Sequence, residues 1–142
     1  MIKIPYDELG KQNFQMAVQK LANSQLRDPV VFRIKHVTKS VREGFLKMRD
    51  EYKKLEEKYA EKNEGKIVEP KEGSEARKCE LPWHTPDEKA KQAKDDLDNF
   101  GKKLLTVNHK KIPFETLFKC NEWSPRELES LEPIVEEPGD SV

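Results

Sequence analysis

The sequence predicts a mainly α-helical fold: an elongated antiparallel helical bundle or hairpin with a long central helix and a minor β element. Two runs of apolar residues, each spaced three or four positions apart, carry this prediction. The first run contains Ile34, Val37, Val41, Phe45, Met48, Tyr52, Leu55 and Tyr59. The second contains Ala90, Ala93, Leu97, Phe100 and Leu104. Such spacing places one apolar stripe on each of two helices, which bury their stripes by packing together.

The composition agrees with long helices that expose most of their surface. The chain has 142 residues, of which 35% are hydrophobic and 38% are charged. A compact globule of this size usually has a larger apolar fraction. The 27 basic and 27 acidic residues balance, so no overall field favours nucleic acid or a membrane. This length predicts a single helical domain over residues 1–135, followed by a disordered acidic tail over residues 136–142.

The first two helices are expected at residues 7–23 and 29–63. Gly10 weakens the first turn of the first helix. Asp28 and Pro29 form a start signal for the second, with a capping carboxylate before a proline at the first helical position. The second helix would be about 35 residues and ~50 Å long, and Gly65 would terminate it. Near Gly44 its apolar spacing shifts, which predicts a change of packing partner.

The second half of the chain is expected to alternate loops and shorter helices. Residues 64–84 read as a loop with a short strand, and residues 106–118 as an extended segment that could pair with that strand. Thr85-Pro86-Asp87-Glu88 predicts a capping box and a helix over residues 86–105. Ser124-Pro125-Arg126-Glu127 predicts a second capping box and a helix over residues 125–131. We expect the first helix to pack on the first half of the central helix, and the third helix on its second half.

The charge pattern gives one candidate for partner binding. Six basic residues and a single acid, Glu43, occupy the stretch from residue 33 to residue 49. The six are Arg33, Lys35, Lys39, Arg42, Lys47 and Arg49. A solvated helix face is the ordinary interpretation of such a run, and contact with a partner is the functional one. A basic helix can also lie along phosphates, but the sequence has no nucleic-acid reading motif, so nucleic acid is the less favoured partner.

The sequence gives little support for catalysis or for metal binding. Cys79, His84, His109 and Cys120 have the composition of a zinc site but not the spacing of a zinc ribbon or finger. His36 and the other histidines have no nucleophile motif beside them, and the glycines form no phosphate-binding loop. We therefore expect no enzyme activity and no cofactor. Trp83 and Trp123 each precede a capped helix and are expected to pack as staples or core residues.

The location is expected to be a reducing one. Two cysteines fit free thiols better than a disulfide framework. The first residues, Met1–Pro5, lack the apolar core of a signal peptide, and no window is apolar enough for a transmembrane helix. We expect a cytoplasm, or a particle assembled there, and no membrane partner.

Three stretches resemble a small family of phage proteins encoded among virion and tail genes. They are Leu21–Leu26, the helix from Phe32–Lys35 to Glu56–Tyr59 with the following Gly65–Val68, and Trp123–Pro125 leading to Leu131–Ile134. The segment from Glu72 to Pro82 lies outside the resemblance. The resemblance implies a phage structural or assembly-associated protein located in the virion or the host cytoplasm, and it transfers no site residue.

The leading hypothesis is a non-enzymatic phage structural or assembly-associated protein. It would bind other virion proteins, and further copies of itself, through helical surfaces. One alternative is a phage-encoded regulator or inhibitor of a host protein. The other is a DNA-associated packaging or ejection factor.

Overall fold

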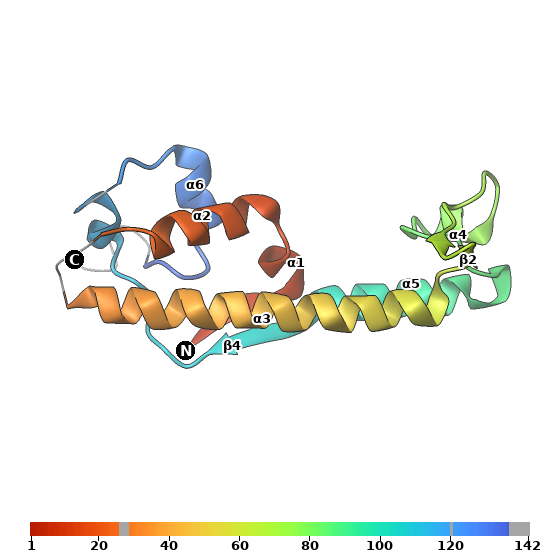
Figure 1. Ribbon diagram of the computed structural model, residues 1–142, viewed down its shortest axis with the longest axis horizontal. Coiled ribbons are helices and arrows are strands. Elements are labelled where there is room, and N and C mark those ends of the chain that lie inside the picture. Colours follow the sequence, from red (N-terminus) through yellow and green to blue (C-terminus); the bar gives the residue numbers. More distant parts are fainter. Residues whose placement is uncertain (26–28, 120, 137–142) are drawn as a thin grey trace. The chain divides into compact units, whose positions relative to one another are not determined.

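The computed structural model describes residues 1–25, 29–119 and 121–136, and it is mainly helical with a long central helix, as predicted (Figure 1). In chain order the elements are β1 (Ile2–Pro5), α1 (Tyr6–Leu9), α2 (Gln12–Ala22), α3 (Val30–Tyr59), β2 (Lys62–Asn63), β3 (Lys66–Ile67), α4 (Glu75–Lys78), α5 (Asp87–Lys102), β4 (Leu104–Val107), the 3₁₀ helix η1 (Phe114–Lys119) and α6 (Pro125–Ser130).

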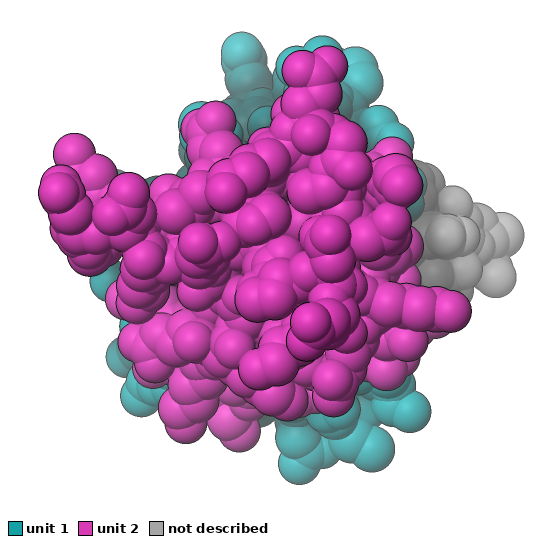
Figure 2. Space-filling view, turned by 90° about the vertical axis from the view of Figure 1, so that its right-hand side faces the viewer, with its two compact units in different colours: residues 1–46, 104–142 teal, residues 47–103 magenta. Residues whose placement is uncertain are grey.

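The chain divides into two compact units, coloured separately in Figure 2. Unit 1 contains residues 1–46 and 104–142, and unit 2 contains residues 47–103. The central helix α3 contributes residues 30–46 to unit 1 and residues 47–59 to unit 2. The single domain expected over residues 1–135 stays a prediction.

The helix predicted over residues 7–23 is wrong as one element, because the structure has two helices there. α1 ends at Leu9, and the Gly10 N–H donates to the Tyr6 carbonyl at 3.0 Å. Lys11 then has extended backbone angles, φ −68° and ψ 131°, and precedes α2. The break at Gly10 and Lys11 redirects the chain, and α2 buries Phe14, Ala17, Val18 and Leu21.

A strand that the sequence analysis did not predict begins unit 1. β1 pairs antiparallel with β4, with Ile2 opposite Val107 and Ile4 opposite Leu105. The side chains of Ile2 and Ile4 are both fully buried. This pairing also ends α5 at Lys102 rather than at residue 105, because Leu104 belongs to the strand and is 52% exposed. The extended segment expected over residues 106–118 is therefore partly β4 and partly the 3₁₀ helix η1.

The first part of α3 contributes buried apolar side chains to unit 1. Ile34, Val37 and Val41 are at most 3% exposed, as their spacing predicted. A Cβ atom on Gly44 would lie 2.5 Å from Leu105 Cδ2, so the absence of a side chain here lets β4 approach the helix closely. The start signal at Asp28 lies outside the described residues.

The helix predicted to reach residue 63 ends at Tyr59. The N–H of Ala60 still donates to the Glu56 carbonyl at 2.7 Å, but the N–H of Glu61 donates to the His84 carbonyl at 2.7 Å. The next residues form the hairpin β2–β3, whose turn residues Glu64 and Gly65 both have positive φ, 53° and 79°. Such a pair favours a tight hairpin turn. Ile67 therefore pairs with Lys62 and not with residues 106–118.

The core of unit 2 surrounds Trp83. Tyr59, Ala76, Leu81, Trp83, Ala90 and Ala93 are buried together. The Trp83 ring meets the Tyr52 ring edge to face, with 5.7 Å between the centroids. The central helix and α5 thus both contribute their apolar stripes to this core, as their spacing predicted.

The capping box predicted at Thr85 is wrong. Pro86 occupies the N-cap position of α5, with φ −52° and ψ 140°, and no side chain caps the helix. Thr85 is fully buried, and its Oγ1 atom has no hydrogen-bond partner among the described residues. The structure thus places the hydroxyl inside unit 2 rather than at the helix end.

The capping box predicted at Ser124 is confirmed. The Glu127 N–H donates to Ser124 Oγ at 3.2 Å, and the Ser124 N–H donates to Glu127 Oε1 at 2.9 Å. The helix α6 ends at Ser130, one residue before the predicted end. After it, Val135 forms a parallel bridge with Ile112, and the Glu136 N–H donates to the Ile112 carbonyl at 2.9 Å. The rest of the predicted acidic tail, residues 137–142, lies outside the described residues.

Candidate functional site

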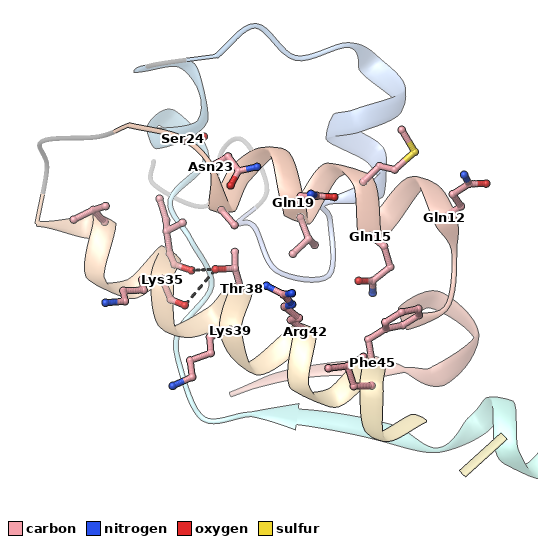
Figure 3. A pocket seen from close by; sticks show the side chains of 16 residues that line it. Gln12, Gln15, Gln19, Asn23, Ser24, Lys35, Thr38, Lys39, Arg42 and Phe45 are labelled. Carbon is pink, nitrogen blue, oxygen red and sulfur yellow. Dashed lines mark hydrogen bonds between the residues drawn. The ribbon is translucent and has the colours of Figure 1, made fainter. Parts of the chain in front are cut away.

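A groove of about 830 Å³ separates α2 from the first part of α3, within unit 1. We call it the α2–α3 groove, and Figure 3 shows the 16 side chains that line it. They are Gln12, Gln15, Met16, Val18, Gln19, Ala22, Asn23, Ser24, Val31, Ile34, Lys35, Thr38, Lys39, Arg42, Phe45 and Leu46. All of these residues are described, and none of them is acidic.

The α3 wall of the groove is basic and apolar. Lys35, Lys39 and Arg42 follow one another at steps of four and three, so they share one face of the helix. In Figure 3, Arg42 extends toward α2, whereas Lys35 and Lys39 reach outward from α3. Within the described part of the chain, no ion pair neutralises these three side chains. The wall therefore presents three positive charges to a ligand.

The hydroxyl of Thr38 does not add to the binding capacity of this wall. It donates to the Ile34 carbonyl at 2.7 Å and is 3.2 Å from the Lys35 carbonyl, both on its own helix (Figure 3). Thr38 is 6% exposed, and these bonds satisfy a hydroxyl that would otherwise be costly to bury. Apolar surface on the same wall comes from Val31, Ile34 and Phe45.

The α2 wall is polar but uncharged. Its amide side chains are Gln12, Gln15, Gln19 and Asn23, and the Gln15 amide donates to the Leu9 carbonyl at 2.6 Å. Met16 projects from the same wall and is 60% exposed, while Leu46 on the opposite wall is 51% exposed. Exposed methionine and leucine beside a concave surface are typical of adaptable contacts with another protein.

The opposite face of α2 is anchored. The Lys20 ammonium donates to the Glu122 carbonyl at 2.5 Å and to Glu127 Oε2 at 3.1 Å, and it lies 4.6 Å from the centroid of the Trp123 ring. The bond from the Ser124 backbone N–H, followed by the bond from Lys20, lowers the pKa of Glu127 below its ordinary value of 4.5. These contacts hold α6 against α2 and leave the groove side of α2 uncovered within the described residues.

The structure brings together three of the six basic residues predicted to bind a partner. Lys35, Lys39 and Arg42 line the groove. Arg33 instead donates to the Lys111 carbonyl at 3.4 Å, and Lys47 and Arg49 belong to unit 2. Sequence reasoning missed the α2 wall, because its stripe of Gln12, Met16, Gln19 and Asn23 carries neither a charge nor a motif.

A smaller hollow of about 420 Å³ lies within unit 2, and its charged groups are largely paired with one another. Lys58 lies 3.6 Å from Asp96, and Lys103 lies 3.8 Å from Glu51. The hydroxyl of Tyr59 also donates to Asp96. Burial, followed by this bond, raises the pKa of Tyr59 above 10.0. Because these charges satisfy each other, the hollow is a weaker candidate for ligand binding than the α2–α3 groove.

The cysteines and histidines that were considered for a zinc site do not form one in the described residues. No group of three or more His, Cys, Asp or Glu side chains there is placed to hold a metal ion. Cys120 of the zinc set lies outside those residues. His84 pairs with Glu61 at 3.1 Å, and the ring of His36 stacks on that of His109 with 5.5 Å between centroids.

No helix in the described ranges has the length and apolar character needed to cross a membrane. Comparisons with models of protein families, with curated protein sequences and with solved structures find no match to this chain.

Proposed function

We propose that this protein is a non-enzymatic phage structural or assembly-associated protein that binds other virion proteins through helical surfaces. The observation that carries the proposal is the α2–α3 groove, an open concave surface whose exposed Met16 and Leu46 face no partner within the described residues. A groove between two helices is a common receptor for a third helix. The antiparallel bundle arrangement predicted from the two apolar stripes belongs to the same proposal.

The chemistry of the groove supports recognition rather than reaction. Its polar lining consists of amides, hydroxyls, two lysines and an arginine. General acid–base catalysis needs a group that titrates near neutral pH, and the 16 lining residues contain no histidine, cysteine or carboxylate. The lining instead combines exposed apolar side chains with a charged rim, which is the usual anatomy of a protein-binding surface.

The proposal is tested by blocking the groove during particle assembly. The double substitution Met16→Glu and Leu46→Glu places two charges on exposed positions, where such changes usually alter folding stability by less than about 0.5 kcal/mol each. We expect the variant to fold but to be lost from purified particles. The matched control is Leu104→Glu, which changes an equally exposed apolar residue of unit 1 outside the groove. Incorporation of both variants at the wild-type level would contradict the proposal.

A DNA-associated packaging or ejection role is the second candidate, favoured by the three cations and the absence of acids in the groove lining. It predicts DNA binding that weakens with salt and with neutralisation of Lys35, Lys39 and Arg42. No DNA binding at low salt would remove this candidate. Regulation of a host protein predicts specific retention of a host enzyme from lysate, which a virion component does not show.

A further inference from the structure

We propose that the α2–α3 groove binds an acidic amphipathic helix of a different protein, rather than a second copy of this chain or a nucleic acid. This inference rests on the proposed function, because it names the class of partner for the same groove. Three features of the groove carry it: its dimensions, the distribution of its apolar surface, and a positive charge that no ion pair among the described residues compensates.

The dimensions fit a helix of about three turns. The α2 wall has 11 residues, which corresponds to ~16 Å at 1.5 Å per residue. A third helix laid between α2 and α3 would cover the apolar lining from both walls at once. Met16 and Leu46 are the exposed apolar side chains available to contact its apolar face, at 60% and 51% exposure. This is the geometry in which an amphipathic helix docks with residues three and four positions apart.

The positive charge of the groove predicts that the polar face of the partner helix is acidic. Lys35, Lys39 and Arg42 recur at steps of four and three along α3, so carboxylates at the same steps on a neighbouring helix can each meet one cation. Arg42 extends toward α2 and is placed to meet a carboxylate inside the groove, while the two lysines reach outward (Figure 3). Arginine is also the better of the two residue types for paired hydrogen bonds to a carboxylate.

The same charge argues against a second copy of this chain in the groove. Two copies joined face to face through the groove would bring together three cations from each, with no acid in either lining. Like charges placed opposite each other across an interface disfavour that pairing. If the chain self-associates, this argument places the contact on a different surface.

Nucleic acid fits the groove less well than an acidic helix. Its phosphates would find cations only on the α3 wall, because the α2 wall offers Gln12, Gln15, Gln19 and Asn23 without a positive charge. The apolar lining would face a charged backbone and gain nothing from it. An amphipathic helix uses the cations and the apolar surface together.

The test is a charge swap with defined peptides and the full chain. The first probe is a peptide of about four turns with leucines three and four positions apart on one face and glutamates beside them. The second probe has lysine at every glutamate position. Binding is measured by fluorescence anisotropy against the wild-type chain and against the triple variant Lys35→Glu, Lys39→Glu, Arg42→Glu. The control variant, Lys53→Glu, Lys89→Glu, Lys91→Glu, makes the same change in net charge at exposed positions outside the groove.

We expect the wild-type chain and the control variant to bind the acidic peptide, with affinity that falls as salt rises. The groove variant should bind it about tenfold more weakly or worse, and should gain affinity for the lysine peptide. That gain also shows that the variant is folded. Equal binding of the acidic peptide by wild type and groove variant, or no binding by either, would overturn the inference.

Two further measurements test the other two possible occupants of the groove, nucleic acid and a second copy of this chain. A short DNA duplex that binds the wild-type chain more tightly than the acidic peptide does, and loses that binding in the groove variant, would overturn the inference in favour of nucleic acid. A dimer of the wild-type chain that dissociates in the Met16→Glu, Leu46→Glu variant would overturn it in favour of self-association. The particle experiment with that double variant asks whether any virion protein contacts the groove, whatever the charge of that partner, so failure of the peptide test leaves the proposed groove function standing.

Discussion

Replacing Thr85 by valine should stabilise unit 2. Thr85 is fully buried, and its hydroxyl has no hydrogen-bond partner among the described residues. An unsatisfied buried hydroxyl costs about 1–3 kcal/mol. Valine keeps the branched shape and replaces the hydroxyl by a methyl group, so the free energy of unfolding should rise by a similar amount. The capping role predicted from sequence gives the opposite sign, because loss of a helix cap costs about 0.5–2 kcal/mol.

The assay is equilibrium unfolding in urea, followed by tryptophan fluorescence. Each compact unit contains one tryptophan, Trp83 in unit 2 and Trp123 in unit 1, so a Trp123→Phe background makes the signal specific for unit 2. With a denaturant dependence of about 1–3 kcal/mol per M, a gain of about 2 kcal/mol moves the midpoint up by roughly 1 M.

A matched variant, Thr85→Ser, keeps the hydroxyl and removes one methyl group. It should destabilise unit 2 by about 1 kcal/mol, because a buried methyl group is lost and the unpaired hydroxyl remains. A valine variant that unfolds at lower urea than the parent, with an unchanged slope, would refute the structural assignment and restore Thr85 as the cap of α5.

Three other substitutions test unit-specific contacts. Ser124→Ala should cost about 1 kcal/mol in the unfolding of unit 1, read from Trp123, because it removes the confirmed cap of α6; no change would contradict the capping box. Glu127→Gln should weaken the pH dependence of the free energy of unfolding of unit 1 below pH 4.5. The reason is that a lowered carboxyl pKa gives stability that is present above pH 4.5 and is lost as the pH falls below it. Identical pH profiles for the variant and the wild type would argue against the bonds from Ser124 and Lys20. Trp83→Ala should cost about 3–5 kcal/mol, and Trp83→Phe far less, because phenylalanine fills most of the site and removes an indole N–H that has no partner among the described residues. Unfolding of both Trp83 variants would be followed by far-ultraviolet circular dichroism, and an equal loss of stability in the two would contradict this account of the indole ring.

Local patterns predicted the helical stripes but not the pairing of distant segments. The spacing of Val37, Val41 and Tyr59 is a property of one helix, and these residues are buried as expected. Ile2 pairs with Val107, which is 105 positions away in the sequence, and a four-residue strand has too little periodicity to predict such a pairing. The same pairing accompanies the early end of α5 at Lys102, for which Gly101, a weak helix former, is the local signal in the sequence.

The two capping predictions show why a motif needs its surroundings. Ser124 and Thr85 both precede a proline and an acidic first turn, and only Ser124 caps its helix. Thr85 follows Trp83 and His84, which are both buried. The backbone N–H of His84 donates to the Val68 carbonyl at 2.8 Å. The side chain of Thr85 is therefore also buried in unit 2. Burial of the preceding residues therefore overrides a local capping preference.

The sequence predicted one wall of the α2–α3 groove, the one on α3, and not the other. The run of basic residues on α3 was apparent in the sequence. The run alone could not show that Lys35, Lys39 and Arg42 line the groove whereas Arg33 donates to the Lys111 carbonyl. The α2 wall carries no charge and no motif, and it becomes part of a site only because α2 lies beside α3. Its contribution comes from tertiary structure, with Lys20 and α6 holding its other face.

Site-specific photo-crosslinking tests the central claim, that the α2–α3 groove is a partner-binding surface, most directly. A photoreactive phenylalanine analogue replaces Met16 or Leu46 in the groove, or Lys3 on an exposed position of β1 as the control. Irradiation during particle assembly should link positions 16 and 46 to the same segment of one virion protein, identified by mass spectrometry, and leave position 3 without that product. Equal labelling from all three positions, or no virion product from the groove positions, would contradict the account.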